Sequence, residues 1–165
     1  MLTLARPDDA DALLTLYRRE IGRPGCTWDE DYPNRGIALR DLARQDVYCL
    51  RDGEGRLYAA VTAAREEELS ALPCWTLRPA HPREIARLAV APEAQGHGLA
   101  ASLLTELFGL LGAQGCDGLR LLVSPDNAAA LKTYARLGFT VCGLCEMYDQ
   151  HWLACEMALT CPLAP

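Results

Sequence analysis

The sequence predicts a single-domain α/β protein with a mixed, partly parallel twisted sheet flanked by helices, in the order β-α-α-β-β-β-α-β-α-β-β. Its 165 residues suit one domain, residues 1–165, better than two. Segments with strand-like alternation and segments with helical periodicity follow one another along the chain. Residues 84–145 contain two strand–helix–strand units. Because such units join parallel strands, we expect part of the sheet to be parallel.

The first third of the chain reads as one strand and two helices. Residues 2–5 alternate as a short strand does, and the acidic residues after Pro7 favour a helix start. Apolar residues recur at helical spacing from 13 to 21 before a glycine- and proline-rich segment ends that helix. Residues 26–33 form a polar loop with two large aromatics, and a second helix is expected from Asn34.

A hairpin and a long loop follow. Residues 47–50 and 57–62 are strand-like and flank the glycine-containing turn at 52–55, which predicts a β-hairpin. The pattern lapses between residues 66 and 82, where three prolines indicate an irregular loop. Long loops in compact domains are often functional, so we expect this one to lie on the substrate side.

The remaining elements alternate until the final pair of strands. A strand at 84–90 ends at Pro92, and the helix after it carries a leucine stripe. The later elements are a buried strand at 119–123, a helix at 130–137 closed by Gly138, and strands at 139–145 and 152–159.

Composition and charge exclude several classes of protein. The chain has 22 acidic and 16 basic residues and a net charge of −6, which argues against nucleic-acid binding. Acidic residues precede any apolar run of signal-peptide length, and no run approaches a membrane span of about 18–20 residues. The eight cysteines are then expected to be reduced thiols, mostly buried, and the protein to be cytoplasmic with no membrane partner.

The most informative segment is the glycine-containing turn between the strand at 84–90 and the next helix. Gly96 and Gly98 allow a close backbone approach, and the free N–H groups of the first helical turn favour an anion. The spacing is neither the Walker pattern nor the dinucleotide fingerprint. Taken by itself, the segment is either a phosphate site or a plain turn.

Two motifs resemble the GCN5-related N-acetyltransferase (GNAT) superfamily. The first is Gln95-Gly96-His97-Gly98-Leu99-Ala100, which is similar to the pattern Gln/Arg-x-x-Gly-x-Gly/Ala. The second runs from Asn127 to Phe139 and follows Asn-x-x-Ala-x-x-x-Tyr-x-x-x-Gly-Phe. The resemblance implies a GNAT-like fold and an acyltransferase that binds coenzyme A, with acetyl-CoA as co-substrate and no metal.

The resemblance also implies where acetyl-CoA binds. The turn would hold the pyrophosphate through Gln95, Gly96, His97, Gly98, Leu99 and Ala100. The strand edge before it would pair with the pantetheine arm through Leu88, Ala89 and Val90, which otherwise read as a buried strand. Asn127 would contact that arm or, in the alternative reading, only start a helix.

Transfer to an amine requires a base and an acid. A lysine-like amine must lose its proton at a cost of about 4.6 kcal/mol at pH 7, and a carboxylate can accept that proton. The resemblance points to Glu84 as the base and to Tyr134 as the acid that protonates the departing thiolate. The alternatives are that Glu84 pairs with Arg83 or Arg87, and that Tyr134 belongs to the core. Glu66, Glu67 and Glu68 are further acidic candidates, more typical of a solvated face.

The acceptor is expected to be a primary amine on a small molecule, acetylated directly in a ternary complex. Trp28, Asp29, Asp31 and Tyr32 either line a site for a cationic acceptor or form a packed loop. The Cys142-x-x-Cys145 pair favours structural thiols, because strand residues three apart face opposite sides. A non-catalytic acyl-CoA-binding sensor is the alternative function, and the terminal strands offer a surface for a homodimer.

Overall fold

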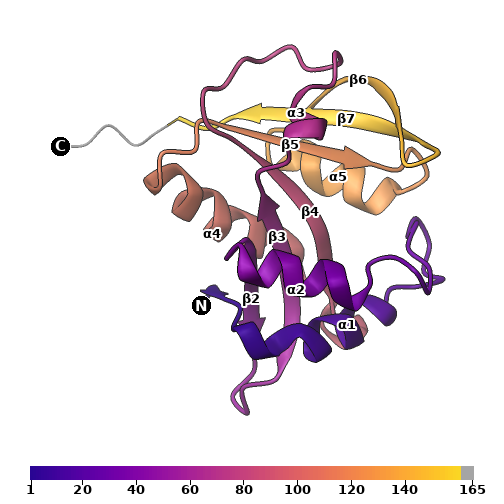
Figure 1. Cartoon of the computed structure of the whole chain (residues 1–165), viewed down its shortest axis with the longest axis vertical. Coiled ribbons are helices and arrows are strands. Elements are labelled where there is room, and N and C mark those ends of the chain that lie inside the picture. Colours follow the sequence, from indigo (N-terminus) through magenta and orange to yellow (C-terminus); the bar gives the residue numbers. More distant parts are fainter. Residues whose placement is uncertain (161–165) are drawn as a thin grey trace.

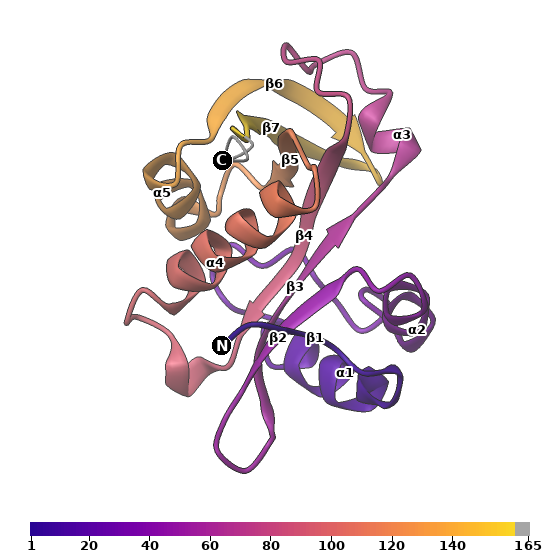
Figure 2. The same cartoon turned by 90° about the vertical axis from the view of Figure 1, so that its left-hand side faces the viewer.

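The computed structural model describes residues 1–160 as a seven-stranded sheet with helices on both faces (Figure 1). The strand order is β1-β2-β3-β4-β5-β7-β6. Helices α1 and α2 cover one face, while α4 and α5 cover the other (Figure 2). The predicted α/β class and the partly parallel sheet are confirmed. Within the described residues, no helix is long and apolar enough to cross a membrane.

The elements follow the predicted order. Within the described residues, the additions are a short helix, α3, inside the segment predicted to be irregular, and two single-turn 3-10 helices, Pro7–Asp9 and Pro92–Ala94. The second helix starts where expected, because Asn34 Oδ1 accepts a hydrogen bond from the N–H of Ile37 at 3.0 Å and caps it. The bounds are β1 Thr3–Leu4, α1 Ala10–Arg18, α2 Arg35–Ala43, β2 Val47–Arg51, β3 Leu57–Ala64, α3 Glu67–Ser70, β4 Pro82–Val90, α4 Leu99–Ala113, β5 Gly118–Val123, α5 Ala128–Arg136, β6 Thr140–Met147 and β7 Gln150–Ala158.

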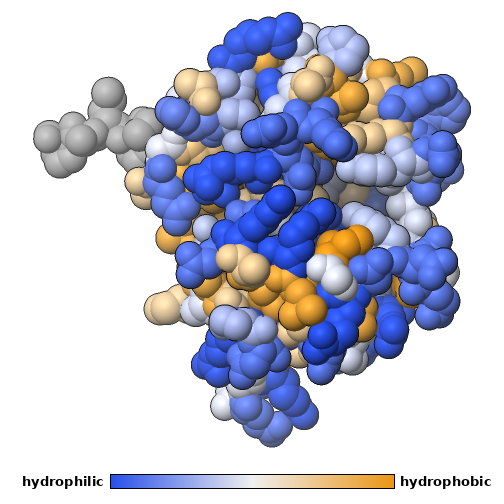
Figure 3. Space-filling view, in the orientation of Figure 1, coloured by the Kyte–Doolittle hydropathy of each residue, from blue (hydrophilic) through white to orange (hydrophobic). Residues whose placement is uncertain are grey.

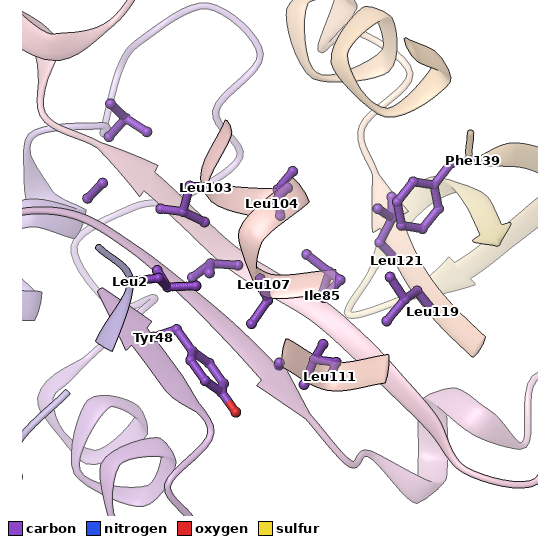
Figure 4. Close-up of a cluster of buried hydrophobic side chains, with 14 of the residues drawn as sticks. Leu2, Tyr48, Ile85, Leu103, Leu104, Leu107, Leu111, Leu119, Leu121 and Phe139 are labelled. Carbon is purple, nitrogen blue, oxygen red and sulfur yellow. The ribbon is translucent and has the colours of Figure 1, made fainter. Parts of the chain in front are cut away.

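A leucine-rich core fixes α4 against the sheet (Figure 4). Leu103, Leu104, Leu107 and Leu111 of α4 are buried together with strand residues such as Leu119. Burying each such side chain contributes about 1.5–3 kcal/mol, so this stripe anchors the helix whose first turn follows the glycine-containing segment. A separate cluster holds α1 and α2 on the opposite face of the sheet.

The two parallel strands pair only at one end. β4 pairs with β5 through Pro82–Glu84, which lie opposite Gly118–Arg120. Within the described residues, β4 makes no further pairing with β5, although it stays paired with β3 as far as Val90. The backbone edge of β4 after Glu84 is therefore open toward β5.

A β-bulge interrupts β4 at Arg87. Thr62 of β3 lies opposite Ala86, but Ala60 lies opposite Ala89. An advance of two residues along β3 therefore corresponds to three residues along β4, so β4 contains one extra residue. Arg87 takes a left-handed conformation with φ of 48°. The bulge changes which side of the sheet the following residues face. Ala89 packs into the cluster of α1 and α2, whereas Ile85, before the bulge, packs under α4.

Candidate active site

The glycine-containing turn presents unpaired backbone donors. Gly96 and Gly98 have φ of 83° and 74°, values that L side chains rarely adopt, and a Cβ on either would meet open space. Gly98 precedes α4 without a side-chain cap. The N–H of Ser102 makes the first helical hydrogen bond, to Gly98 O at 3.0 Å, so the amides before it have no partner inside the helix. This geometry suits an anion such as a phosphate.

The side chain of Gln95 secures the turn. Its Nε2 donates to Val90 O at 2.7 Å and to Glu20 Oε1 at 2.9 Å. Its Oε1 accepts a hydrogen bond from Arg23 Nη2 at 2.6 Å. The segment after α1 and the end of β4 are thus tied to the turn through one amide group. His97, by contrast, is exposed at the tip of the turn.

Asn127 lies beside the same region, at the start of α5. Its Oδ1 accepts a hydrogen bond from the N–H of Ala130 at 3.1 Å, so the side chain does cap the helix. Gly25 abuts it so closely that a Cβ on Gly25 would lie 2.8 Å from Asn127 Cα. The segment after α1 therefore contacts both the turn before α4 and the start of α5.

Tyr134 of α5 is partly buried at the edge of the core. Its ring makes an edge-to-face contact with Phe139, with centroids 5.6 Å apart. Burial raises the pKa of the Tyr134 phenol to about 12, so it stays protonated at neutral pH, the form a proton donor needs. Both readings of Tyr134, as a core residue and as an acid, are compatible with this placement.

Glu84 is a partly buried carboxylate at the point where β4 and β5 separate. Burial raises the pKa of Glu84 to about 7, against the lowering effect of the Arg87 charge. The two neighbours expected to pair with it are engaged elsewhere. Arg83 donates to Ala63 O at 3.0 Å and lies 3.3 Å from Asp46 Oδ1, and Arg87 pairs with Asp41. A carboxylate with this proton affinity can accept a proton near neutral pH.

The segment between α1 and α2 holds the four residues predicted to line the acceptor site. Trp28 packs edge-to-face on Tyr17 of α1, with ring centroids 5.4 Å apart. Asp29 Oδ1 accepts hydrogen bonds from the N–H groups of Asp31 and Tyr32, both at 2.9 Å, and so shapes the loop. Tyr32 reaches β4, because its hydroxyl accepts a hydrogen bond from Arg87 Nη1 at 3.1 Å.

The turn between β6 and β7 approaches this loop. Figure 1 shows both segments at the same side of the molecule. The pKa of Tyr148, an exposed residue in that turn, is raised by partial burial and by the charge of Glu84, with Tyr32 also contributing. Tyr32, Glu84 and Tyr148 come from three separate segments and therefore lie around one region.

Sequence reasoning missed the buried ion pair of Asp41 and Arg87, whose Oδ2 and Nε lie 2.7 Å apart. Their side chains are only 1% and 7% exposed. Asp41 sits on a helix and Arg87 on a strand, with no motif linking them. The bulge that turns Arg87 toward α2 leaves no signature in the alternation pattern.

The cysteines stay apart from this site. All seven in the described residues are free thiols, and Cys161 lies outside those residues. A register shift between Val141 and Gly143 breaks the alternation of β6. The expectation that Cys142 and Cys145 face opposite sides is therefore wrong, since both lie near Cys74. Among residues 1–160, no group of three or more His, Cys, Asp or Glu side chains could hold a metal ion.

Solved structures of acetyltransferases share this fold. A GNAT-family acetyltransferase from Streptococcus agalactiae aligns with a TM-score of 0.79 and 24% identity, over 96% of this chain and 94% of that one. The Salmonella typhimurium acetyltransferase candidate yncA, solved with its cofactor acetyl-CoA, aligns with a TM-score of 0.73 and 17% identity, over 100% of this chain and 96% of that one. At these identities the likeness establishes the fold.

Relatives identified by sequence are acetyltransferases as well. Acetyltransferase ECA0875 of Pectobacterium atrosepticum is 25% identical over 139 residues, which are 84% of this chain and 86% of that protein. The mycothiol acetyltransferase of Gordonia bronchialis is 39% identical over 135 residues, which are 80% of this chain and 40% of that protein. The chain thus spans well under half the length of the mycothiol acetyltransferases it matches. The model of the acetyltransferase (GNAT) family matches residues 12–139, and the chain belongs to this family of acetyltransferases.

Proposed function

We propose that the protein transfers an acetyl group from acetyl-CoA directly to a primary amine on a small molecule, within a ternary complex. The observation that carries this proposal is the alignment of three features along β4. These are the open strand edge, the unpaired amides of the turn after it, and the carboxylate of Glu84 at the other end. Structures with the same fold have been solved with acetyl-CoA, among them yncA and a phosphinothricin acetyltransferase from Sinorhizobium meliloti.

The residues along β4 and α4 fit acetyl-CoA. The amides from Gly96 to Ala100 would bind the pyrophosphate, and each such contact at a helix start stabilises an anion by about 0.3–1 kcal/mol. The open edge at Leu88, Ala89 and Val90 would pair with the amide groups of the pantetheine arm. Asn127, which packs against Gly25, would contact that arm through its amide NH₂ group. Acetyl-CoA supplies the activated thioester.

Glu84 and Tyr134 would carry the proton transfers. Glu84 takes a proton from the ammonium of the acceptor, directly or through water, and leaves a neutral amine to attack the thioester carbonyl. Tyr134, which is protonated at neutral pH, donates its proton to the departing thiolate as the carbon–sulfur bond breaks, and the tyrosinate recovers a proton from the nitrogen that has formed the amide. Positioned acids and bases of this kind each contribute about 10²–10⁴-fold to the rate.

The acceptor would enter between the loop of Trp28, Asp29, Asp31 and Tyr32 and the turn that carries Tyr148. Tyr32, Glu84 and Tyr148 lie around this region, and its two tyrosine rings suit a small amine with an apolar portion. The partial matches to mycothiol acetyltransferases agree with a small-molecule acceptor.

An assay of coenzyme A release over a panel of primary amines tests the proposal. We expect turnover with at least one amine, a loss of about 10²-fold or more in Glu84→Gln, and a comparable loss in kcat in Tyr134→Phe. Binding of acetyl-CoA without release of coenzyme A on any amine would contradict the proposal. That result would support a non-catalytic acyl-CoA sensor.

A further inference from the structure

Glu84 has no direct partner in the described chain. No hydrogen bond or ion pair joins its carboxylate to residues 1–160. A partly buried carboxylate normally acquires such a partner, because burial without one is costly. Two arginines, Arg40 and Arg87, nevertheless act on this carboxylate electrostatically.

The arginines near Glu84 are engaged elsewhere. Arg120, which lies opposite Glu84 on β5, donates to the carbonyl oxygens of Ser70 and Leu77 at 3.4 and 3.2 Å, whereas Arg87 and Arg40 are held by another acid. Arg87 Nε lies 2.7 Å from Asp41 Oδ2. Arg40 donates from Nη2 to Asp41 Oδ1 at 3.0 Å, and the same Nη2 lies 3.7 Å from Glu66 Oε1. Asp41 therefore holds both arginines, one with each carboxylate oxygen.

The carboxylate of Asp41 belongs to a network that crosses three elements. Thr62 of β3 donates to Asp41 Oδ2 at 3.5 Å, and Arg44 of α2 binds Glu66 at 3.3 Å. Hydrophilic side chains dominate the surface between α2 and α3, where this network reaches solvent (Figure 3). Arg87 is its buried end. Neither its Nε nor its Nη2 makes a hydrogen bond, although Nε lies in ion-pair contact with Asp41 Oδ2, 2.7 Å away.

We infer that Asp41 and Arg87 are positioning residues for Glu84: their ion pair keeps the neighbouring arginines engaged and leaves the Glu84 carboxylate unpaired, so that it can take a proton from the acceptor. This inference rests on the proposed function, in which Glu84 is the base. Without Asp41, the guanidinium of Arg87 would lose the carboxylate that fixes it and could turn to bind Glu84, and an arginine-bound carboxylate is a weak base.

The charges around Glu84 act in opposite directions. Arg40 of α2 and Arg87 of β4 lower its pKa, while Asp41 of α2 and Glu66, before α3, raise it. From the turn between β6 and β7, Tyr148 faces the same group as a neutral phenol. Removing the charge of Asp41 should therefore lower the pKa of Glu84, and removing the charge of Arg87 should raise it.

The test compares the pH dependence of kcat/KM in the wild type and four variants. Asp41→Asn is expected to move the acidic limb down by about 1 pH unit, and Arg87→Gln to move it up by about 1 unit. The double variant should return to within about 0.3 unit of the wild type, because the two charges cancel. Arg56→Gln, on the exposed hairpin between β2 and β3, removes the same charge far from Glu84 and should cause no shift.

A direct titration separates this inference from the proposed function. Carbon-13 NMR of glutamate-labelled protein, with Glu84 assigned through Glu84→Gln, reports the protonation of that carboxyl without turnover. If its midpoint shifts as predicted while the acidic limb of the rate does not follow, Asp41 and Arg87 set the proton affinity of Glu84 but Glu84 is not the base, so the proposed function fails. Asp41→Asn and Arg87→Gln could instead both lose activity, while neither the rate profile nor the NMR titration shifts in opposite directions. The pair would then have only a structural role, and the inference would be overturned.

A fifth variant keeps the test decisive if a buried substitution prevents folding. Arg40 is 44% exposed, so Arg40→Gln should fold, and its lost positive charge should raise the midpoint of Glu84 by about 0.5 unit. No upward shift in Arg40→Gln would count against the inference.

Discussion

Glu84 and Arg87 face the same side of the sheet although they are three residues apart on β4. In a regular strand they would face opposite sides, but the bulge at Arg87 inserts one residue and reverses the alternation. The arginine consequently reaches Asp41 of α2 and Tyr32 of the adjoining loop. A single backbone irregularity thus places a buried charge pair beside the proposed base.

Loss of the Glu84 carboxylate is expected to abolish the acidic limb of the rate profile. The wild type should show a limb with a midpoint near 7, the pKa to which burial raises Glu84. In Glu84→Gln, kcat/KM should fall about 10²–10⁴-fold and that limb should disappear. Glu67→Gln, an exposed position in the first turn of α3, is the control and should retain activity. Activity of Glu84→Gln within about twofold of wild type would rule out a base at this position.

The same substitution is expected to stabilise the protein at high pH. The pKa of Glu84 is higher in the folded state than the ordinary value of 4.5, so its favourable contribution is complete below pH 4.5 and is lost as pH rises through about 7. Glu84→Gln should therefore raise the free energy of unfolding at pH 8 by about 2–3 kcal/mol. Urea denaturation at pH 4.5 and pH 8 measures this difference. Equal effects at both pH values would contradict the raised pKa.

Tyr134→Phe is expected to slow the chemical step and leave binding intact. The substitution removes the hydroxyl but keeps the ring that packs on Phe139. We expect kcat to fall about 10²-fold while calorimetry finds unchanged affinity for acetyl-CoA. Tyr48→Phe removes a hydroxyl from a buried core tyrosine and serves as the matched control. A fall in acetyl-CoA affinity with unchanged kcat would show that Tyr134 binds rather than catalyses.

Substitution of the turn glycines is expected to weaken binding of acetyl-CoA. Gly96→Ala and Gly98→Ala place a Cβ where φ is 83° and 74° and add it on the surface that would face the pyrophosphate. The dissociation constant should rise about tenfold or more, equivalent to at least about 1.4 kcal/mol. Gly55→Ala introduces the same strain, at φ of 81°, in the distant β2–β3 hairpin. An equal change in affinity in this control would attribute the effect to strain alone.

The succession of elements could be predicted from the sequence because each has a clear local pattern. The leucine spacing of α4 and the continuous apolar run of β5 both reflect how those elements are buried. The four-residue helix α3 was not predicted, since its residues Glu67–Ser70 offer only one buried side chain, Leu69. Short helices leave too little periodicity to detect.

The fine structure of the site could not be predicted, because it depends on irregular backbone and long-range contacts. The bulge at Arg87 and the register shift in β6 each reverse the alternation on which face assignments rest. The partnership of Asp41 with Arg87 joins residues from separate elements, as does the contact between Gly25 and Asn127. The motif residues themselves were found because their spacing is local.

A crystal structure with acetyl-CoA would show whether the turn before α4 holds the cofactor. We expect diphosphate oxygens within hydrogen-bond distance of the amides between Gly96 and Ala100, and the pantetheine arm paired along β4 from Val90 toward Glu84. Acetyl-CoA bound elsewhere on the molecule, with these amides facing solvent, would rule out the proposed site.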